Sequence, residues 1–315
     1  MSRLFSAVCL LFVSFFLSCV AQAQVRVLTS IKPLQLIAAA VQDGVGQPEV
    51  LLPPGASPHH YALRPSDVRS VQEAELLYWV GPDLETFLPR VLSGRAKASV
   101  QTQDLPGMSL RHFGEGQDEE HAGHAEHESE HAFDEHDHAH RLGSLDAHLW
   151  LLPANARVIA RKMAADLSLA DPANAARYQA NVDAFEQRLD ALDERLKARL
   201  KGLAGKPYFV FHEAYDYFEA AYGLKHAGVF SVLGEVQPGA KHVAAMRERL
   251  QQAGPTCVFS EPPLLPRLAK TLTAGLPVTL AEMDAMGGSL PVDARGYEAL
   301  LENLAGELAG CLEAL

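Results

Sequence analysis

The stretch DPANAARYQANVDAFEQRLDALDERLKARLKG, residues 171–202, decides the architecture. Its apolar residues recur at steps of four and three, which predicts one amphipathic helix. The members of this apolar stripe are Tyr178, Val182, Phe185, Leu189, Leu192, Leu196 and Leu200. Asp171 followed by Pro172 is a helix start signal, and Gly202 and Gly205 are stop signals. About thirty residues with a rise of 1.5 Å each predict a helix of roughly 45 Å, long enough to span two domains.

Short apolar runs alternate with helical patterns on both sides of this helix. Strands are predicted at residues 24–30, 48–52, 76–81 and 98–102, and again at 207–212, 228–232, 257–261 and 277–283. Such alternation indicates parallel sheets in the α/β class. The sequence therefore predicts an N-terminal α/β domain over residues 24–170, a linking helix over 171–203 and a C-terminal α/β domain over 204–315. A coiled-coil partner for the long helix is the alternative.

The first residues have the pattern of an export signal. Arg3 precedes an apolar run, and Ala21-Gln22-Ala23 supplies the small residues of a cleavage site. We expect a signal peptide over residues 1–23, cleaved after Ala23, and an exported chain. An uncleaved anchor is one alternative, although the run is short for a membrane span of about 20 residues. A lipoprotein attached through Cys19 is another.

Two cysteines remain after the predicted cleavage, Cys257 and Cys311. An even pair in an exported chain suggests a disulfide. The bridge would close a loop of about 55 residues and stabilise the fold by roughly 4 kcal/mol in the chain-entropy estimate. Two buried thiols are the alternative.

The net charge of −12 is concentrated in one segment. Residues 115–140 contain ten Asp or Glu and no Lys or Arg, so the rest of the chain carries only −2. A nearly neutral body without a basic stripe argues against nucleic-acid binding.

The same acidic segment holds seven histidines. They are His121, His124, His127, His131, His136, His138 and His140. Acids and imidazoles without apolar support predict a loop, residues 115–141, that is disordered without metal. Each metal bound there must order the chain, so we expect weak accessory sites. A purely solvating loop is the alternative.

Isolated polar residues at strand ends form a second candidate site. In open parallel sheets, ligands bind beyond the carboxyl ends of the strands. His59 and His60 follow the second predicted strand, His212 ends the fifth, Asp284 follows the eighth, and His148 comes shortly after the acidic loop. Neighbouring side chains diverge in extended backbone, so only one of His59 and His60 can face a metal. Three imidazoles suit Zn²⁺, and added oxygen ligands would favour Mn²⁺ or Fe²⁺.

Three histidines with an open position also occur in catalytic zinc sites. However, HEAYD at residues 212–216 lacks the second histidine of H-E-x-x-H, and no Walker-type loop is present. A secreted zinc hydrolase with Glu213 as base therefore stays an alternative to a non-enzymatic metal-binding protein. An adhesin is another alternative. His226 and His242 have no strand-end position and are interpreted as structural.

Several of these segments resemble a known family. GASPHHYALRPSDVRSVQEAELLYWVGPDLE (55–85), DAHLWLLPANA (146–156) and FVFHEAYDYFEAAYGL (209–224) are similar to the ligand segments of cluster A-I solute-binding proteins of ABC transporters. VFSEPPLLPRLAKTLT (258–273) and AEMDAMGG (281–288) are similar to the C-terminal signature of that family. The resemblance runs from about residue 25 to the C-terminus. The acidic histidine-rich insertion and the cysteine pair match its ZnuA branch, which takes up zinc.

This resemblance implies two small α/β domains joined by one rigid long helix, with the metal in the cleft between them. It implies the ligands His59, His148 and His212, with His60 as the alternative to His59. Water or Asp284 would be the fourth ligand, and Glu261 is a candidate to orient an imidazole.

The function implied by the resemblance is high-affinity Zn²⁺ capture in the periplasm and delivery to an inner-membrane ABC permease. The expected protein is a monomer without enzymatic activity. A Mn²⁺ or Fe²⁺ carrier of the same family is the alternative.

Overall fold

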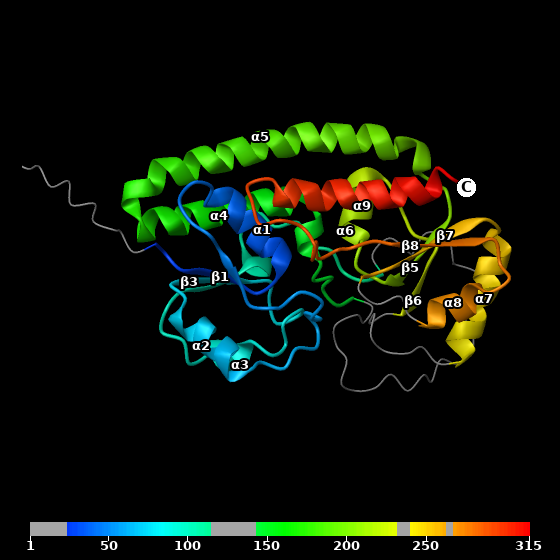
Figure 1. Ribbon diagram of the computed structural model, residues 1–315, viewed down its shortest axis with the longest axis horizontal. Helices are drawn as coiled ribbons and strands as arrows, with labels where there is room; N and C mark the ends of the chain where they lie inside the picture. Colours follow the sequence, from blue (N-terminus) through cyan, green and yellow to red (C-terminus); the bar gives the residue numbers. More distant parts are fainter. Residues whose placement is uncertain (1–23, 115–142, 232–239, 263–266) are drawn as a thin grey trace, which may run out of the picture.

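The computed structural model describes residues 24–114, 143–231, 240–262 and 267–315. The predicted signal peptide with its cleavage site and the seven histidines of the acidic loop lie outside these residues. In the described part, two parallel sheets are each flanked by helices (Figure 1). This architecture confirms the predicted α/β class.

The first sheet has the strand order β2-β1-β3-β4, with every pair parallel. Its strands are β1 (Val27–Thr29), β2 (Glu49–Val50), β3 (Leu76–Trp79) and β4 (Ser99–Gln101). The helices of this half are α1 (Lys32–Val41), α2 (Pro65–Glu73), α3 (Pro89–Leu92) and α4 (Pro153–Ala170), with 3₁₀ turns η1 (Thr102–Asp104) and η2 (Leu149–Leu151).

The second sheet repeats this order as β6-β5-β7-β8, again parallel throughout. Its strands are β5 (Tyr208–His212), β6 (Gly228–Ser231), β7 (Thr256–Ser260) and β8 (Val278–Glu282). The helices are α6 (Asp216–Tyr222), α7 (Ala240–Ala253), α8 (Arg267–Thr273) and α9 (Gly296–Leu312). In both sheets the first strand lies between the second and the third. The strand order reverses there, which is where ligands bind in such sheets.

The long helix α5 (Ala175–Leu200) lies along one side of both halves (Figure 1). The 3₁₀ turns η3 (Pro172–Asn174) and η4 (Lys201–Leu203) extend it at both ends. All seven residues of the predicted apolar stripe are buried. The prediction of one long helix that links two α/β halves is therefore confirmed. No helix in the described part of the chain is both long and apolar enough to cross a bilayer.

A second connection between the halves runs through α9 and the segment before it. The Trp150 indole N–H donates to the carbonyl of Ala285 at 2.9 Å, and the Tyr297 hydroxyl donates to the carbonyl of Trp150 at 2.7 Å. At the other end of α9, Cys311 forms a disulfide with Cys257 of β7, as predicted. Buried residues of both halves accordingly belong to one continuous apolar core.

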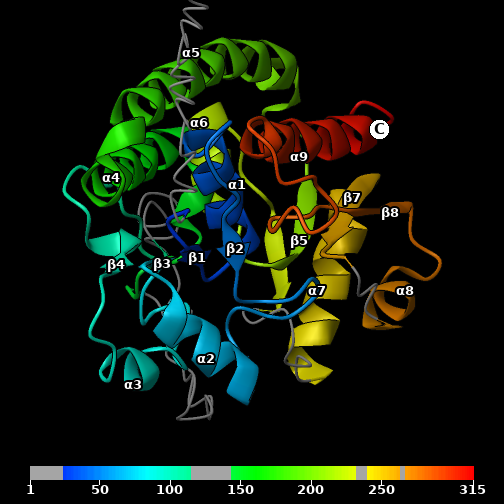
Figure 2. The same ribbon diagram turned by 60° about the vertical axis from the view of Figure 1, so that its left-hand side comes forward.

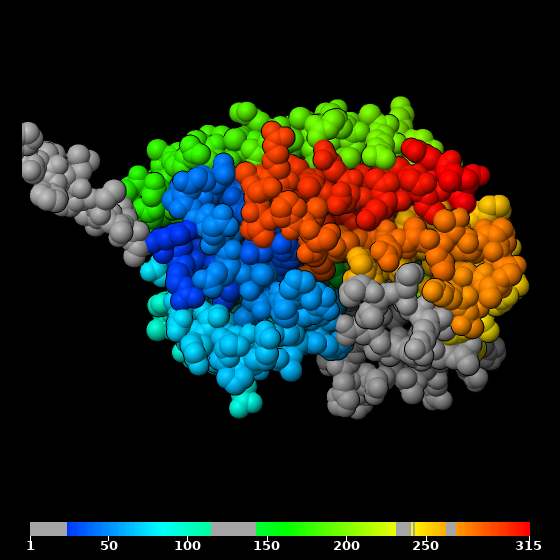
Figure 3. Space-filling model, viewed as in Figure 1, coloured from blue at the N-terminus to red at the C-terminus, as the bar shows by residue number. Residues whose placement is uncertain are grey.

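The two connecting helices lie together. In the rotated view, α4, α5 and α9 form a layer above the two sheets (Figure 2). The space-filling view shows the segment before α9 seated against the N-terminal half, while α9 continues over the C-terminal half (Figure 3). The helices α5 and α9 thus pack against both halves and connect the two sheets.

Candidate metal centre

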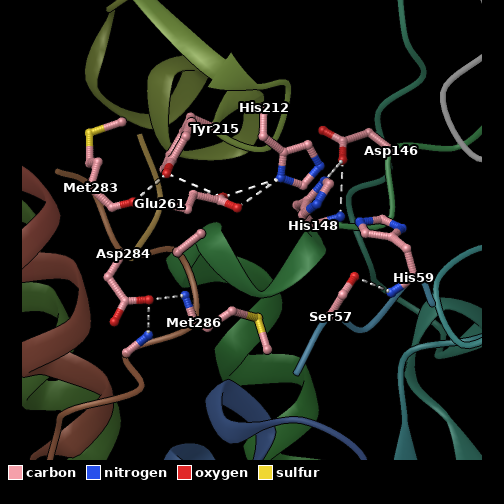
Figure 4. Close-up of polar contacts among 12 residues, drawn as sticks. Ser57, His59, Asp146, His148, His212, Tyr215, Glu261, Met283, Asp284 and Met286 are labelled. Carbon is pink, nitrogen blue, oxygen red and sulfur yellow. Dashed lines mark hydrogen bonds and ion pairs between the residues drawn. The ribbon is translucent and has the colours of Figure 1, made fainter. Parts of the chain in front are cut away.

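Three histidines from distant parts of the chain converge between the two sheets (Figure 4). His59 lies in the loop after β2, His148 precedes η2, and His212 is the last residue of β5. The ring centroids of His148 and His212 are 4.9 Å apart, and those of His59 lie 5.3 Å from His212 and 5.5 Å from His148. One ring nitrogen of each residue lies within 4.8 Å of the other two.

All three side chains are buried. The exposed fractions are 9% for His59, 2% for His148 and 6% for His212. Zinc–nitrogen bonds of 2.0–2.1 Å in a tetrahedral site place the nitrogens about 3.4 Å apart. A small inward movement of the three rings would therefore bring one nitrogen of each to bonding distance from a tetrahedral zinc ion.

The His148 ring is held by Asp146. Its Nδ1 lies 2.8 Å from Asp146 Oδ1, and the backbone N–H of His148 donates to the same oxygen at 3.0 Å. A proton on Nδ1 leaves the lone pair on Nε2, which is the nitrogen that can then bind a metal. Sequence reasoning missed Asp146, although an acid two positions before a candidate ligand was a readable signal.

The His212 ring is held by Glu261. Its Nδ1 lies 3.2 Å from both carboxylate oxygens, and the Tyr215 hydroxyl lies 3.3 Å from Glu261 Oε1. Tyr215 also donates to the carbonyl of Met283 at 2.6 Å. His212 ends β5 and Glu261 follows β7, the neighbouring strand, so this pair sits where the strand order of the second sheet reverses. Glu261, expected as an orienting group, therefore does contact a candidate ligand.

The environments of the three imidazoles differ in charge. Burial lowers the pKa of His148 well below its usual range, and repulsion from His212 lowers it further. The pKa of His59 is also lowered well below its usual range, mainly by burial and then by repulsion from His212 and His148. For His212, burial opposes protonation, but the charge and hydrogen bond of Glu261 outweigh it and raise the pKa. Burial also raises the pKa of Asp146 to about 7. His59 and His148 are thus neutral, as metal binding requires, and protons compete mainly at His212.

The two remaining predicted residues lie elsewhere. His60 is exposed, with its ring centroid 6.5 Å from that of His59, and is outside the histidine group. Asp284 is also outside it (Figure 4). Its Oδ1 accepts the backbone N–H groups of Met286 and Gly287, both at 2.9 Å, and its Oδ2 accepts that of Gly288 at 2.8 Å. The Asp284 carboxylate therefore holds a turn and does not join the three imidazoles.

Asp284→Ala is expected to leave the Zn²⁺ affinity unchanged. It should lower the free energy of unfolding by about 1–3 kcal/mol, because three backbone N–H groups lose their acceptor. Chelator competition and urea unfolding measure the two effects. Asp293→Ala, which removes the acceptor of a single N–H on an exposed loop, is the control. A tenfold loss of Zn²⁺ affinity in Asp284→Ala alone would show instead that Asp284 is a ligand.

Comparison with known proteins identifies the family. Residues 27–311 match the ZnuA family, described as zinc-uptake complex component A, periplasmic. The high-affinity zinc uptake system protein ZnuA of Yersinia pestis is 39% identical over 293 residues, which cover 92% of each chain. The protein of that name from Brucella abortus (strain 2308) is 37% identical over 304 residues, or 91% of each chain.

Solved structures share the fold at lower identity. A crystal structure of ZnuA has a TM-score of 0.72 and 21% identity, covering 91% of this chain and 98% of that chain. The SBP FpvC of Pseudomonas aeruginosa in complex with Mn²⁺ has a TM-score of 0.71 and 19% identity, covering 92% and 98%. The family match over nearly the whole chain, together with the identity to the two relatives, shows that this protein belongs to the ZnuA family of periplasmic zinc-uptake components.

Proposed function

We propose that this protein captures Zn²⁺ in the periplasm and delivers it to an inner-membrane ABC permease. The observation that carries the proposal is the buried group of His59, His148 and His212, in which two imidazoles are oriented by carboxylates. Three imidazoles and one water complete a tetrahedral zinc site. The names of the relatives, which are zinc uptake system proteins, support the same cargo.

The ligand set favours zinc over manganese. Mn²⁺ prefers carboxylate, carbonyl and water oxygens, whereas imidazole suits Zn²⁺. Three carboxylates near the histidines have other roles: Asp146 and Glu261 hold imidazoles, and Asp284 holds a turn. In a competition titration we expect Zn²⁺ to bind at least about 100-fold more tightly than Mn²⁺, as this ligand chemistry and the Irving–Williams order require.

We propose that residues 1–23 direct export and are removed after Ala23, and that the seven histidines of loop 115–141 bind additional zinc weakly. The mature protein would act as a monomer without enzymatic activity. N-terminal sequencing of the periplasmic form should begin at Gln24.

Zinc uptake by cells tests the function directly. Cells that lack this protein should accumulate less radioactive zinc from zinc-poor medium than cells that produce it. The wild-type chain should restore uptake, and His148→Ala produced at the same level should not. Equal uptake with and without the protein would contradict a role in zinc delivery.

The zinc affinity is expected to fall as the pH is lowered. Glu261 raises the pKa of His212, so below this pKa a proton must leave before zinc binds, and affinity falls by about tenfold per pH unit. In Glu261→Gln the pKa of His212 is lower, so the decline should begin at a lower pH. The same variant should bind zinc about 10–100-fold more weakly at neutral pH, because the imidazole loses its orienting carboxylate.

Isothermal titration of both proteins between about pH 5.5 and pH 8, the range in which histidine titrates, measures these effects. An affinity that is constant over this range in the wild type would contradict an all-histidine site. Identical pH profiles for the two proteins would show that Glu261 does not control the proton on His212.

A further inference from the structure

A second group of metal-binding side chains lies next to the histidine centre. Glu213 follows His212, Asp216 begins α6, and His226 lies in the turn before β6. One ligand atom of each of Glu213, Asp216 and His226 lies within 4.8 Å of the other two. Within residues 24–114, 143–231, 240–262 and 267–315, the two groups of His, Cys, Asp and Glu that meet this spacing are this one and the three histidines.

The His226 ring is oriented in the same way as two rings of the main centre. Its Nδ1 lies 3.0 Å from both carboxylate oxygens of Glu219 and 3.8 Å from Asp216 Oδ1. Glu219 is 4% exposed and accepts a hydrogen bond from the Tyr208 hydroxyl at 2.6 Å, so its position is fixed. A buried carboxylate that takes the Nδ1 proton leaves the lone pair of the imidazole on Nε2, the arrangement found behind metal-binding histidines. Asp216 contacts the ring at Nδ1, so an ion bound through Nε2 requires the Asp216 side chain to move toward that nitrogen.

The group carries more negative than positive charge. Glu213, Asp216 and Glu219 approach one another, and in the described part of the chain their ion pairs involve His226 rather than any Lys or Arg. The charge of Arg111 also favours the ionised form of Asp216. The carboxylates of Glu213, Asp216 and Glu219 still outnumber these two cations and repel one another, and a divalent cation would neutralise that repulsion.

We propose that Glu213, Asp216 and His226 form a second site for a borderline divalent cation such as Zn²⁺, with Glu219 holding the imidazole. Two carboxylates and one imidazole match the ligand preferences of this class of ion. The side chains are only partly buried, so this site binds more weakly than the three-histidine centre. Asp146 lies close to both sites, because it bonds His148 and its charge acts on Glu213 and Asp216. His226 is thus assigned a binding role, in place of the structural one predicted from its position.

Equilibrium dialysis of the full-length chain against Zn²⁺ tests the proposal. Asp216→Asn and His226→Gln should each bind one weak equivalent less than the wild type and retain the tight equivalent with unchanged affinity. Glu282→Gln, which alters an exposed carboxylate at the end of β8, is the matched control and should bind as the wild type does. The acidic loop has the same sequence in all variants, so the comparison with Glu282→Gln reports on this site.

His148→Ala separates the second site from the main one. This variant should lose the tight equivalent and keep the weak equivalent that Asp216→Asn lacks. Equal numbers of weak equivalents in the wild type and in Asp216→Asn would overturn the proposal, whatever His148→Ala shows. Loss of the tight equivalent in Asp216→Asn would also overturn it, because the group would then support the main centre instead of binding its own ion.

Discussion

His148→Ala is expected to bind Zn²⁺ about 100- to 1000-fold more weakly than the wild type. Complete zinc sites contribute about 10–16 kcal/mol from four ligands, so one imidazole accounts for roughly 2.5–4 kcal/mol. His148 is 2% exposed and burial lowers its pKa, so the variant loses a buried, neutral imidazole. The variant leaves Asp146 buried without its imidazole. Burial already raises the pKa of Asp146 to about 7, so this carboxyl can take up a proton and the folding cost is reduced.

Competition with a chelator of known zinc affinity measures the change, and His60→Ala is the matched control. His60 is the exposed neighbour of His59 and lies outside the histidine group. The control should bind the tight Zn²⁺ equivalent as the wild type does. If His60→Ala lost the tight equivalent and His148→Ala kept it, the three-histidine centre would be the wrong assignment.

The long helix was predictable because its signals are local. The apolar spacing in α5 is a property of 26 consecutive residues and needs no tertiary information. The predicted start at Asp171 lies four residues before the first residue of the α-helix. The α-helix begins at Ala175, after a 3₁₀ turn, and the Asp171 carboxylate accepts hydrogen bonds from the Asn174 side chain at 2.7 Å and the Tyr178 hydroxyl at 2.9 Å. Asp171 thus supports the first turns through side chains, which the start signal alone did not reveal.

The role of α9 depends on contacts that are distant in sequence. The helix α9 covers Gly296–Leu312. The sequence pattern does not show what the helix packs against, so its connection of the two halves was not foreseen. That connection rests on Trp150, which is 135 positions from Ala285 and 147 positions from Tyr297.

The sequence could predict which polar residues follow the strands and are therefore candidate ligands. The rule that parallel sheets bind ligands beyond their carboxyl ends pointed to His59 or His60 and to His212, whereas His148 entered through its place after the acidic loop and through the family resemblance. The structure brings His59, His148 and His212 together. The same rule included Asp284, whose carboxylate is used by the backbone N–H groups that follow it. Gly287 has a φ of 62°, and this left-handed residue lets the turn close on the carboxylate. The glycines after Asp284 were a local signal for such a turn.

The group around His226 could not be predicted in the same way. His226 is ten positions from Asp216. The two meet because α6 ends at Tyr222, the following Gly223 takes the left-handed conformation, and the chain turns back toward β6. The positions of strand ends do not show that the chain after α6 folds back and brings His226 beside Asp216, the first residue of that helix.

Reduction of the Cys257–Cys311 disulfide is expected to lower the free energy of unfolding of the metal-free protein by about 4 kcal/mol. The bridge spans 54 positions and restricts the unfolded chain accordingly. It joins β7 to the end of α9, so it also ties the strand that leads to Glu261 to the helix that connects both halves. Urea unfolding with and without a phosphine reductant compares the same sequence in both states.

The zinc site should respond much less than the stability does. β7 stays paired with β5 on one side and β8 on the other, so Glu261 keeps its position near His212 in the folded, reduced protein. We expect the tight affinity to change by less than about tenfold, which is below the effect of losing an orienting carboxylate outright. The Cys257→Ala/Cys311→Ala variant, which cannot form the bridge, should match the reduced protein apart from lost packing at two buried side chains. A decrease in unfolding free energy of less than about 1 kcal/mol on reduction would show that the packing of α9 in the shared core, and not the bridge, holds β7 in place.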